Sequence, residues 1–496
     1  MSPVDQLSRA IKYFHSGQYG EAKVLLEQVR SDAPELVMAQ VYLAQIGILA
    51  GEGERWVAPL QELAMQLPHS HEVYHVLGQC LQQAKQLPQA ATAFHTALAL
   101  VAIQVEQGWQ PSPKQEEPVA PFSQEQGEAL LWQTLALLKS QGVYGFACSG
   151  TLLGLEREGR LLANDKDLDI GVDWLQMEQA TQVLSANGWR EASRSYDLIN
   201  PRCFKHDVTG ITLDVCGFGT DSVSGEAICG LWMDGVPFHW NRITYFPNIA
   251  LSARGTPAGE VWHLTQPESM LAALYGDNWR IPDGDFDTIV CAHNLRQFSW
   301  LSYCYAYSRL YGQWLRGNTA KAMRILQVLR QQRPQDSVLS QIQQQLETSL
   351  LVERQERVLA LGYFDLLHEG HLNYLQFARQ LGGTLVVGIA PDRFCQQSKG
   401  YSPILNENQR CTLINALGMV DETHLVAAPM AQTDDAVAWI RSLAIHKVVC
   451  GEEWQGSERW QKLEAALAPF EIEVIYAPKT EGISTTLLKQ RILQNS

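Results

Sequence analysis

The chain has 496 residues, enough for about three domains, and 46% of them are hydrophobic, so each domain can bury a core. A formal net charge of -15 argues against a nucleic-acid partner, because such proteins usually carry a basic face. The ten cysteines form no CxxC pair, which indicates reduced thiols and no disulfide framework. The sequence contains neither a signal peptide nor an apolar run long enough for a transmembrane segment, so we expect a cytoplasmic protein.

The N-terminal region contains a repeat. Gly17 and Pro34 recur as Gly51 and Pro68, and the same offset places Lys85 at the glycine position of a third unit. Apolar residues recur at helical spacing between these markers. The period, from Gly17 to Gly51, is 34 residues. It resembles that of tetratricopeptide repeats (TPR), which implies a scaffold that binds a protein partner. A generic helical bundle is the alternative.

The chain changes character several times after these repeats. A stretch rich in Pro, Gln and Glu indicates a linker, and mixed sequence follows it. Later, Gly317 and Pro334 repeat the spacing of the N-terminal markers, which predicts one further helical hairpin. We therefore expect a multidomain protein with TPR-like helical repeats at 1–105, a linker at 106–122, an α+β domain at 123–300, a helical connector at 301–352 and an α/β domain at 353–496.

Acidic residues alternate along a strand-like run in the middle region. Asp167 and Asp169 are separated by one residue, so both carboxylates face the same side of a strand. Asp214, in a second alternating strand, is a third candidate. Carboxylates gathered on one face are costly unless they are solvated, paired or bridged by a cation. The pattern predicts a Mg²⁺ (or Mn²⁺) site formed by the three aspartates, and a solvated sheet edge is the alternative.

The ordered motifs around this run resemble the LicD and fukutin-related family. The segment GTLLG…NDKDLDI matches that family's GTLLG…DDDIDI, and YGDNWRIP at Tyr275–Pro282 matches its YGxDWxxP-like ending. The resemblance implies a nucleotidyltransferase-like domain that transfers a phosphorylated alcohol from a CDP-linked donor to a glycan. It further implies catalytic roles for Asp167, Asp169 and Asp214. The turn containing Gly150 and Thr151 is expected to approach a phosphate closely.

The last third alternates strands with amphipathic helices. The expected strands are Val358–Leu361, Thr384–Ala390, Lys447–Cys450 and Glu473–Ala477. Such alternation predicts a Rossmann-like, doubly wound parallel sheet with ligands at the carboxyl ends of its strands.

The first of these strands leads into GYFDLLHEGH, from Gly362 to His371, and then into a helix. The turn offers a helix N-terminus and the imidazoles of His368 and His371 to one phosphate. Donors placed there stabilise the charge that develops on an α-phosphate as pyrophosphate leaves. The alternative is that the two histidines only cap the helix and fill space.

This segment resembles the HxGH nucleotidyltransferase superfamily, and specifically its glycerol-3-phosphate cytidylyltransferase branch. KTEGISTT, from Lys479 to Thr486, matches that family's RTEGISTT. The resemblance implies that His368 and His371 are catalytic, that Lys399 reaches the triphosphate from a loop, and that Arg410 contacts phosphates. Its implied substrate-binding residues are Gly362, Phe364, Asp365, Lys479, Ser484, Thr485 and Thr486. Lysine at position 479 retains the charge of the family's arginine and loses its bidentate fork.

Together the two resemblances predict a bifunctional enzyme. The C-terminal domain would join CTP and glycerol 3-phosphate into CDP-glycerol, and the middle domain would pass glycerol phosphate to a glycan acceptor at the inner membrane face. One alternative replaces the alcohol by ribitol phosphate, phosphocholine or phosphoethanolamine. Another makes the part of the chain before the C-terminal domain a catalytically silent scaffold. The resemblance is also compatible with a homodimer.

Overall fold

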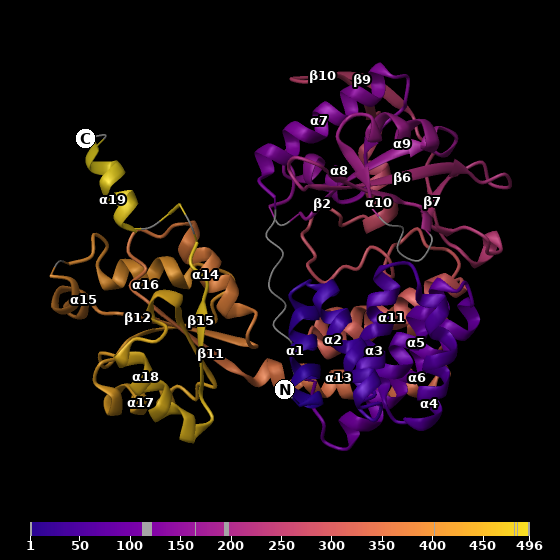
Figure 1. The fold of residues 1–496 in the computed structure, drawn as a ribbon. Coiled ribbons are helices and arrows are strands. Elements are labelled where there is room, and N and C mark those ends of the chain that lie inside the picture. Colours follow the sequence, from indigo (N-terminus) through magenta and orange to yellow (C-terminus); the bar gives the residue numbers. More distant parts are fainter. Residues whose placement is uncertain are drawn as a thin grey trace. The chain divides into compact units, whose positions relative to one another are not determined.

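The computed structural model describes residues 2–111, 122–163, 165–192, 198–400, 402–480, 482–483 and 485–494. The chain forms two compact units, Met1–Leu346 and Glu347–Ser496 (Figure 1). The division falls inside helix α13 (Ser337–Gln355), a few residues before the expected boundary at residue 353. Most of the expected linker, residues 112–121, lies outside the described residues. Among the described helices, none combines the length and apolar character that crossing a bilayer demands.

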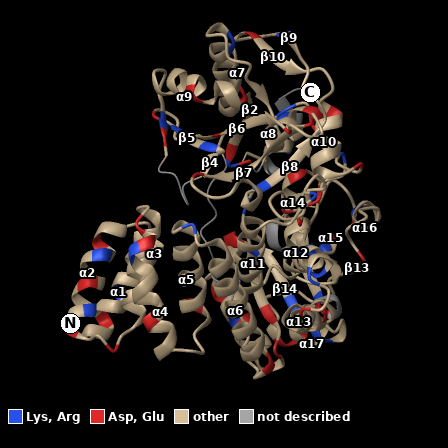
Figure 2. Ribbon diagram, turned by 90° about the vertical axis from the view of Figure 1, so that its right-hand side faces the viewer, with Lys and Arg blue, Asp and Glu red and all other residues tan. Residues whose placement is uncertain are grey.

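The N-terminal part of the first unit consists of helical hairpins in which acidic and basic residues are interspersed (Figure 2). Its helices are α1 (Pro3–His15), α2 (Tyr19–Asp32), α3 (Met38–Leu49), α4 (Val57–Gln66), α5 (His71–Gln83) and α6 (Leu87–Glu106). The first helix of each hairpin ends in the same way, with a left-handed residue at Gly17, Gly51 or Lys85. The next amide then donates back to a carbonyl five residues earlier, as from Gln18 to Tyr13. The period of the sequence repeat thus corresponds to a repeated helix cap.

A fourth hairpin follows the middle domain in sequence. It consists of α11 (Trp300–Leu315) and α12 (Thr319–Gln332), and Gly317 adopts the same left-handed conformation between them. Helix α11 packs against α5 and α6: the Cys304 thiol donates to the carbonyl of Leu87 at 3.4 Å, and the Tyr311 hydroxyl lies 2.8 Å from Nδ1 of His71. The residues expected to form a connector therefore extend the N-terminal helical layer, and the middle domain is an insertion within it.

The middle domain is built on a mixed sheet. Its central strands β2 (Asp167–Asp173) and β6 (Thr212–Thr220) run parallel, with Asp169 opposite Asp214. The other strands pair antiparallel: β1 (Phe146–Ala147), β3 (Trp189–Glu191), β4 (Leu198–Asn200), β5 (Arg202–His206), β7 (Ala227–Met233) and β8 (Arg242–Phe246). A separate hairpin joins β9 (Leu251–Thr256) to β10 (Gly259–Leu264).

The two faces of this sheet differ. Leu168, Ile170 and Val172 of β2 point into a core with α7 (Gln124–Ser140) and α9 (Met177–Ser185). The opposite face carries Asp167, Asp169, Gly171 and Asp173 in alternation and lies under α8 (Ser149–Arg157) and α10 (Pro267–Tyr275). Because Gly171 has no side chain, the rings of Phe146 and Phe218 pack directly over it. A Cβ there would lie 2.5 Å from the Phe146 ring.

The second unit is a five-stranded, entirely parallel sheet in the order β13-β12-β11-β14-β15. Its strands are β11 (Arg357–Gly362), β12 (Thr384–Ile389), β13 (Glu422–Leu425), β14 (Lys447–Gly451) and β15 (Glu473–Ala477). Apolar clusters cover both faces of the sheet, which is the doubly wound, Rossmann-like arrangement expected from the sequence. Its helices are α14 (Glu369–Arg379), α15 (Asp392–Lys399), α16 (Glu407–Asn415), α17 (Thr433–Ser442), α18 (Glu458–Leu467) and α19 (Thr485–Gln494).

Two elements of this unit differ from the sequence-based expectation. Strand β13 was not expected, because ETHL is short, half polar and lies at the sheet edge. Lys399, expected in a loop, is the last residue of α15, which Gly400 ends in a left-handed conformation. Helix α15 therefore includes Lys399, the residue that was expected to lie in a loop.

We predict that Gly51→Ala destabilises the helical layer by about 1 kcal/mol, because position 51 is left-handed and a side chain there strains the backbone. A Cβ at Gly51 would meet nothing within 4 Å, so the effect reports backbone conformation alone. Urea unfolding followed by circular dichroism measures it. The matched control is Gly20→Ala in the first turn of α2, also in open space, which should stabilise the protein. Equal effects of the two substitutions would contradict this account.

Candidate functional site

The C-terminal site forms where the strand order reverses. The chain proceeds from β11 to β12 and β13 on one side, then returns to β14 and β15 on the other. Loops that leave β11 and β14 therefore diverge at the carboxyl edge of the sheet and open a crevice there. The segment from Gly362 to His371 occupies this position, directly between β11 and α14.

The two histidines lie together at the start of α14. His368 is the N-cap residue, and His371 follows in the first turn of the helix. Their rings stack with centroids 3.9 Å apart and planes inclined by 19°. Nδ1 of each ring is buried and has no hydrogen-bond partner among the described residues. Buried polar atoms in proteins are usually satisfied, so these two nitrogens indicate a place for a ligand with acceptor oxygens.

The turn before the helix is conformationally unusual. Phe364 and Leu366 have positive φ angles of 52° and 51°, a region that bulky residues seldom adopt. Phe364 is 2% exposed and its ring lies 5.4 Å from that of His371, so core packing holds the turn in place. A Cβ at Gly370 would approach the His368 ring to 3.1 Å, which explains the small residue between the histidines. Strained backbone that packing maintains is typical of functional sites.

Asp365 joins this turn to two other segments. Its carboxylate accepts hydrogen bonds from the amides of Ile404 and Leu405, and the ammonium of Lys489 in α19 lies 2.9 Å away. Burial alone would raise the pKa of Asp365, but Lys489 and the two amides outweigh it and hold the pKa below its ordinary value. Asp365 is thus a charged anchor within the turn.

Helix α19 brings its first residue to the histidines. The Thr485 hydroxyl donates to the carbonyl of Asp365 at 3.0 Å and lies 3.4 Å from Nε2 of His368. Thr485 and the HxGH turn therefore meet, although they are far apart in sequence. Ser484 and the side chain of Thr486 lie outside the described residues.

Three expected contacts are placed differently or not described. Arg410 is fully buried, and its guanidinium bonds to the carbonyls of Leu405, Tyr363 and Ala390 and to the Asp392 carboxylate. In this structure it therefore holds loops together instead of facing a ligand. Lys479 is exposed, and its amide donates to Glu452 at 3.0 Å. The side chain of Lys399 lies outside the described residues.

Burial keeps both imidazoles uncharged near neutral pH. It lowers the pKa of His371 to about 4, with a further decrease from the neighbouring His368, and it also lowers the pKa of His368. A neutral imidazole donates through one nitrogen and accepts through the other. At pH 7 the pair offers N–H donors to phosphate oxygens without carrying a formal charge.

The acidic site of the middle domain gathers the three expected aspartates and a fourth. Asp167 and Asp169 share one face of β2, and Asp214 lies beside Asp169 on β6. Burial, then repulsion by Asp167, Asp214 and Asp165, raises the pKa of Asp169 well above its ordinary value. Burial and Asp167 raise the pKa of Asp165 to about 7. Burial and mutual repulsion therefore make full ionisation of this cluster costly.

A cation would relieve this repulsion, and one carboxylate oxygen, Oδ2 of Asp165, is buried with no hydrogen-bond partner among the described residues. No three side chains of His, Cys, Asp or Glu stand in ligand geometry within the described part of the chain. The donor chemistry suits Mg²⁺ or Mn²⁺, and the metal remains a prediction.

Gly150 and Thr151 hold β2 in place. The Gly150 amide donates to Oδ2 of Asp169 at 2.9 Å, and the Thr151 hydroxyl accepts from the Asp169 amide at 2.7 Å. Ser149, with φ of 45°, provides the sharp entry to α8 that brings both groups to the strand. Gly150 and Thr151, which were expected to contact a phosphate, therefore bond to Asp169 in this structure.

Sequence reasoning did not single out two residues that the structure brings into these sites. Asp165 continues the alternation of Asp167 and Asp169 by one further step, which was a readable signal. Lys489 follows Thr485 by four residues and so lies on the same side of α19. Its pairing with Asp365 depends on tertiary structure, so no local pattern indicated it.

Comparison with known proteins agrees with this geometry. Residues 359–491 match the family model described as cytidylyltransferase-like. With the relatives described next, this match places the chain in the cytidylyltransferase-like family through its C-terminal domain. The glycerol-3-phosphate cytidylyltransferase of Bacillus subtilis (strain 168) is 34% identical over 139 residues, which are 28% of this chain and 97% of that protein.

Other relatives carry other names. The FAD synthase of Thermococcus sibiricus is 31% identical over 141 residues, 28% of this chain and 93% of that protein. The ethanolamine-phosphate cytidylyltransferase of Dictyostelium discoideum is 35% identical over 136 residues, 27% of this chain and 37% of that protein. Each of these alignments spans 27% or 28% of this chain, about the length of the segment that matches the family model.

We predict that His371 titrates with a pKa of about 4, well below the ordinary 6.5, because its ring is buried beside His368. The folded pKa lies below the unfolded one, so the group contributes its full stability above pH 6.5, and this contribution is lost as the pH falls toward 4. NMR of ¹³C-labelled histidine rings, with His371→Asn to assign the resonance, measures the midpoint. A midpoint close to the ordinary value would contradict the buried, uncharged pair.

Proposed function

We propose that this chain is a bifunctional enzyme that makes CDP-glycerol from CTP and glycerol 3-phosphate and transfers glycerol phosphate from it to a glycan acceptor, releasing CMP. The observation that carries the first half is the stacked, uncharged pair His368 and His371 beside the start of α19. The name of the Bacillus subtilis relative and the KTEGISTT segment favour glycerol 3-phosphate over other alcohols.

In the first reaction, a phosphate oxygen of glycerol 3-phosphate attacks the α-phosphorus of CTP. The bond from that phosphorus to the bridging oxygen breaks, and pyrophosphate leaves with the electron pair. The nucleophile is already an anion, so the protein has no proton to remove. Its task is to hold the reactants in line and to stabilise charge on the α-phosphate, which suits the N–H donors of His368 and His371 and the N-terminus of α14.

In the second reaction, an acceptor hydroxyl oxygen attacks the phosphorus that bears glycerol. The bond to the CMP phosphate breaks, CMP leaves, and the hydroxyl proton passes to a carboxylate, for which Asp214 is our candidate. Mg²⁺ or Mn²⁺ held by Asp167, Asp169 and Asp214 would supply positive charge near the diphosphate. The support for this half is the shared sheet face of the three aspartates and their raised pKa values.

The remaining proposals concern context. The repeated helix caps favour a tetratricopeptide-like layer that recruits a protein partner. The LicD-like motifs favour a glycan acceptor, reached from the cytoplasm at the inner membrane face, and the cytidylyltransferase-like domain is compatible with a homodimer. Synthesis and use of the donor by one chain would raise its local concentration near the second site.

We predict that His368→Ala and His371→Ala each lower the rate of CDP-glycerol synthesis by about 10²- to 10³-fold, because each removes a donor to the developing charge. The assay incubates the whole protein with CTP or ATP, Mg²⁺ and a panel of acceptors, with mass detection of each nucleotide product. The panel contains glycerol 3-phosphate, ribitol 5-phosphate, phosphocholine, phosphoethanolamine and FMN. Failure of every CTP reaction would contradict the proposed synthetase, and preference for another alcohol would replace the assigned substrate.

We predict that Asp167→Asn abolishes CMP release from CDP-glycerol with an acceptor and leaves CDP-glycerol synthesis unchanged, because the carboxylate belongs to the other unit. The measurement follows CMP and CDP-glycerol in parallel by chromatography. The matched control is Asp207→Asn, an exposed residue in the same domain, which should affect neither reaction. Unaltered CMP release from the Asp167 variant would favour a catalytically silent scaffold, and loss of both reactions would contradict separate sites.

A further inference from the structure

The middle domain contains a cavity of about 480 Å³ at the carboxyl ends of β2 and β6. Its lining includes Tyr144, Phe146, Asp173, Phe218, Asn248 and Trp262. The volume is within the range of small-molecule sites, and the lining combines aromatic faces with a few polar groups, as such sites do. The motifs that identified the acidic cluster assign no role to these lining residues.

The cavity is separate from the acidic cluster. Asp173 follows Asp169 by four residues along β2, a distance of about 13 Å in an extended strand. Between them, the buried rings of Phe146 and Phe218 close over Gly171. A molecule bound in the cavity is therefore too far from Asp169 to react there. Any function of the cavity is distinct from that of the acidic cluster.

Two aromatic side chains of the cavity, Tyr144 and Trp262, contact each other and are partly exposed to solvent. Tyr144 is 49% exposed, and its ring centroid lies 5.3 Å from that of the half-buried Trp262, with planes inclined by 36°. The ammonium of Lys139 lies 4.3 Å from the centroid of the Trp262 ring and bonds to Glu260 at 3.2 Å, so the indole is held in place. Such rings offer flat apolar faces to a ligand.

The polar groups of the cavity select against phosphates. Among the described lining residues, Asp173 is the only charged one, and no Lys, Arg or His is present. Oδ1 of Asp173 accepts from the Leu175 amide at 2.8 Å, which fixes the carboxylate at the cavity. An anionic nucleotide or alcohol phosphate would meet the Asp173 carboxylate, and the Lys139 ammonium over Trp262 is already paired with Glu260. A neutral ligand with many hydroxyl groups fits both the rings and the carboxylate.

We propose that this cavity is a binding site for a neutral saccharide. The apolar face of a pyranose ring would pack on Trp262 and Tyr144. The Asp173 carboxylate would accept hydrogen bonds from its hydroxyls, and the Asn248 amide would both accept and donate. The site anchors a sugar residue away from Asp167, Asp169 and Asp214 and takes no part in the chemistry. The inference does not require the proposed transferase, because binding is measurable without any donor.

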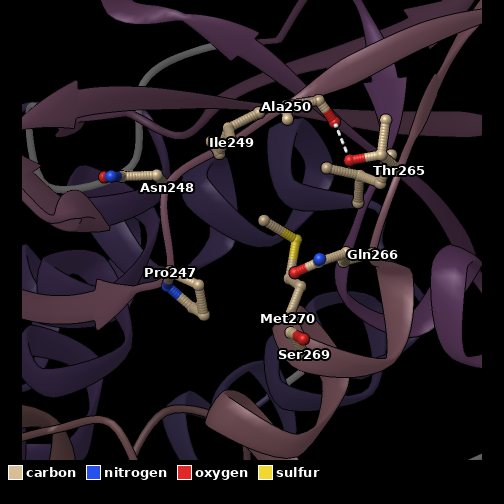
Figure 3. Close-up of a pocket in the computed structure, with 9 residues that line it drawn as sticks. Pro247, Asn248, Ile249, Ala250, Thr265, Gln266, Ser269 and Met270 are labelled. Atoms are coloured by element: carbon tan, nitrogen blue, oxygen red, sulfur yellow. Dashed lines mark hydrogen bonds between the residues drawn. The ribbon is translucent and has the colours of Figure 1, made fainter.

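A smaller cavity continues this surface. It has a volume of about 130 Å³ and shares Asn248 and Ile249 with the larger one. Figure 3 shows the Asn248 side chain directed away from Gln266 and Met270, which line the smaller cavity. The segment that contains Asn248 and Ile249 is thus common to both cavities, and a saccharide longer than one ring could extend from one to the other.

The test titrates the full-length protein, without nucleotides, with cellobiose, maltose, lactose and N,N′-diacetylchitobiose, followed by saturation-transfer difference NMR. We expect at least one disaccharide to bind and CMP not to displace it. Trp262→Leu and Tyr144→Ala should each weaken its binding about tenfold, the value of one aromatic contact. Trp240→Leu, at a tryptophan outside both cavities, is the matched control and should bind normally.

Tyr144→Ala is the deciding variant, because Tyr144 is half exposed and its replacement leaves the core intact. The proposal is overturned if no disaccharide gives a signal, if Tyr144→Ala binds as well as the unaltered protein, or if CMP displaces the sugar. Saccharide binding in a protein that fails to release CMP would refute the transferase and sustain this inference. Normal transfer of glycerol phosphate without saccharide binding would support the transferase and refute this inference.

Discussion

The organisation of the C-terminal site depends on one buried carboxylate. Asp365 lies in the strained turn between β11 and α14, and it binds the amides of Ile404 and Leu405 and the ammonium of Lys489. These partners come from separate segments of the domain, so a single side chain aligns the histidines, the loop before α16 and helix α19. Because a buried, paired charge is costly to uncouple, the three segments are expected to hold a common geometry.

Under the proposed function, the two candidate sites would handle the charge of phosphates in opposite ways. At the C-terminal site the protein offers uncharged imidazoles and the N-terminus of α14, so phosphate oxygens would meet oriented dipoles. In the middle domain it presents aspartates that repel one another, and only an added cation makes such a surface compatible with a diphosphate. The contrast favours two distinct chemistries in one chain.

Much of this structure was predictable from local patterns. The HxGH turn, the strands of the parallel sheet and the alternation of Asp167 and Asp169 all depend on residues near one another in sequence, and the structure has them where expected. Strand β13 was missed because edge strands need little apolar sequence. The burial of Arg410 was missed because its partners come from distant loops, and a motif gives residue types without their surroundings.

The return of α11 to the N-terminal helices has a consequence for biosynthesis. Tyr311 meets His71 across 240 residues of chain, so the face of α5 and α6 that α11 covers waits for the whole middle domain to be translated. At roughly 5–20 residues per second, that interval lasts on the order of 10–50 s. During it that helical face lacks α11, and the His71 and His75 side chains lack the hydroxyl partners that Tyr311 and Ser308 provide in the folded protein.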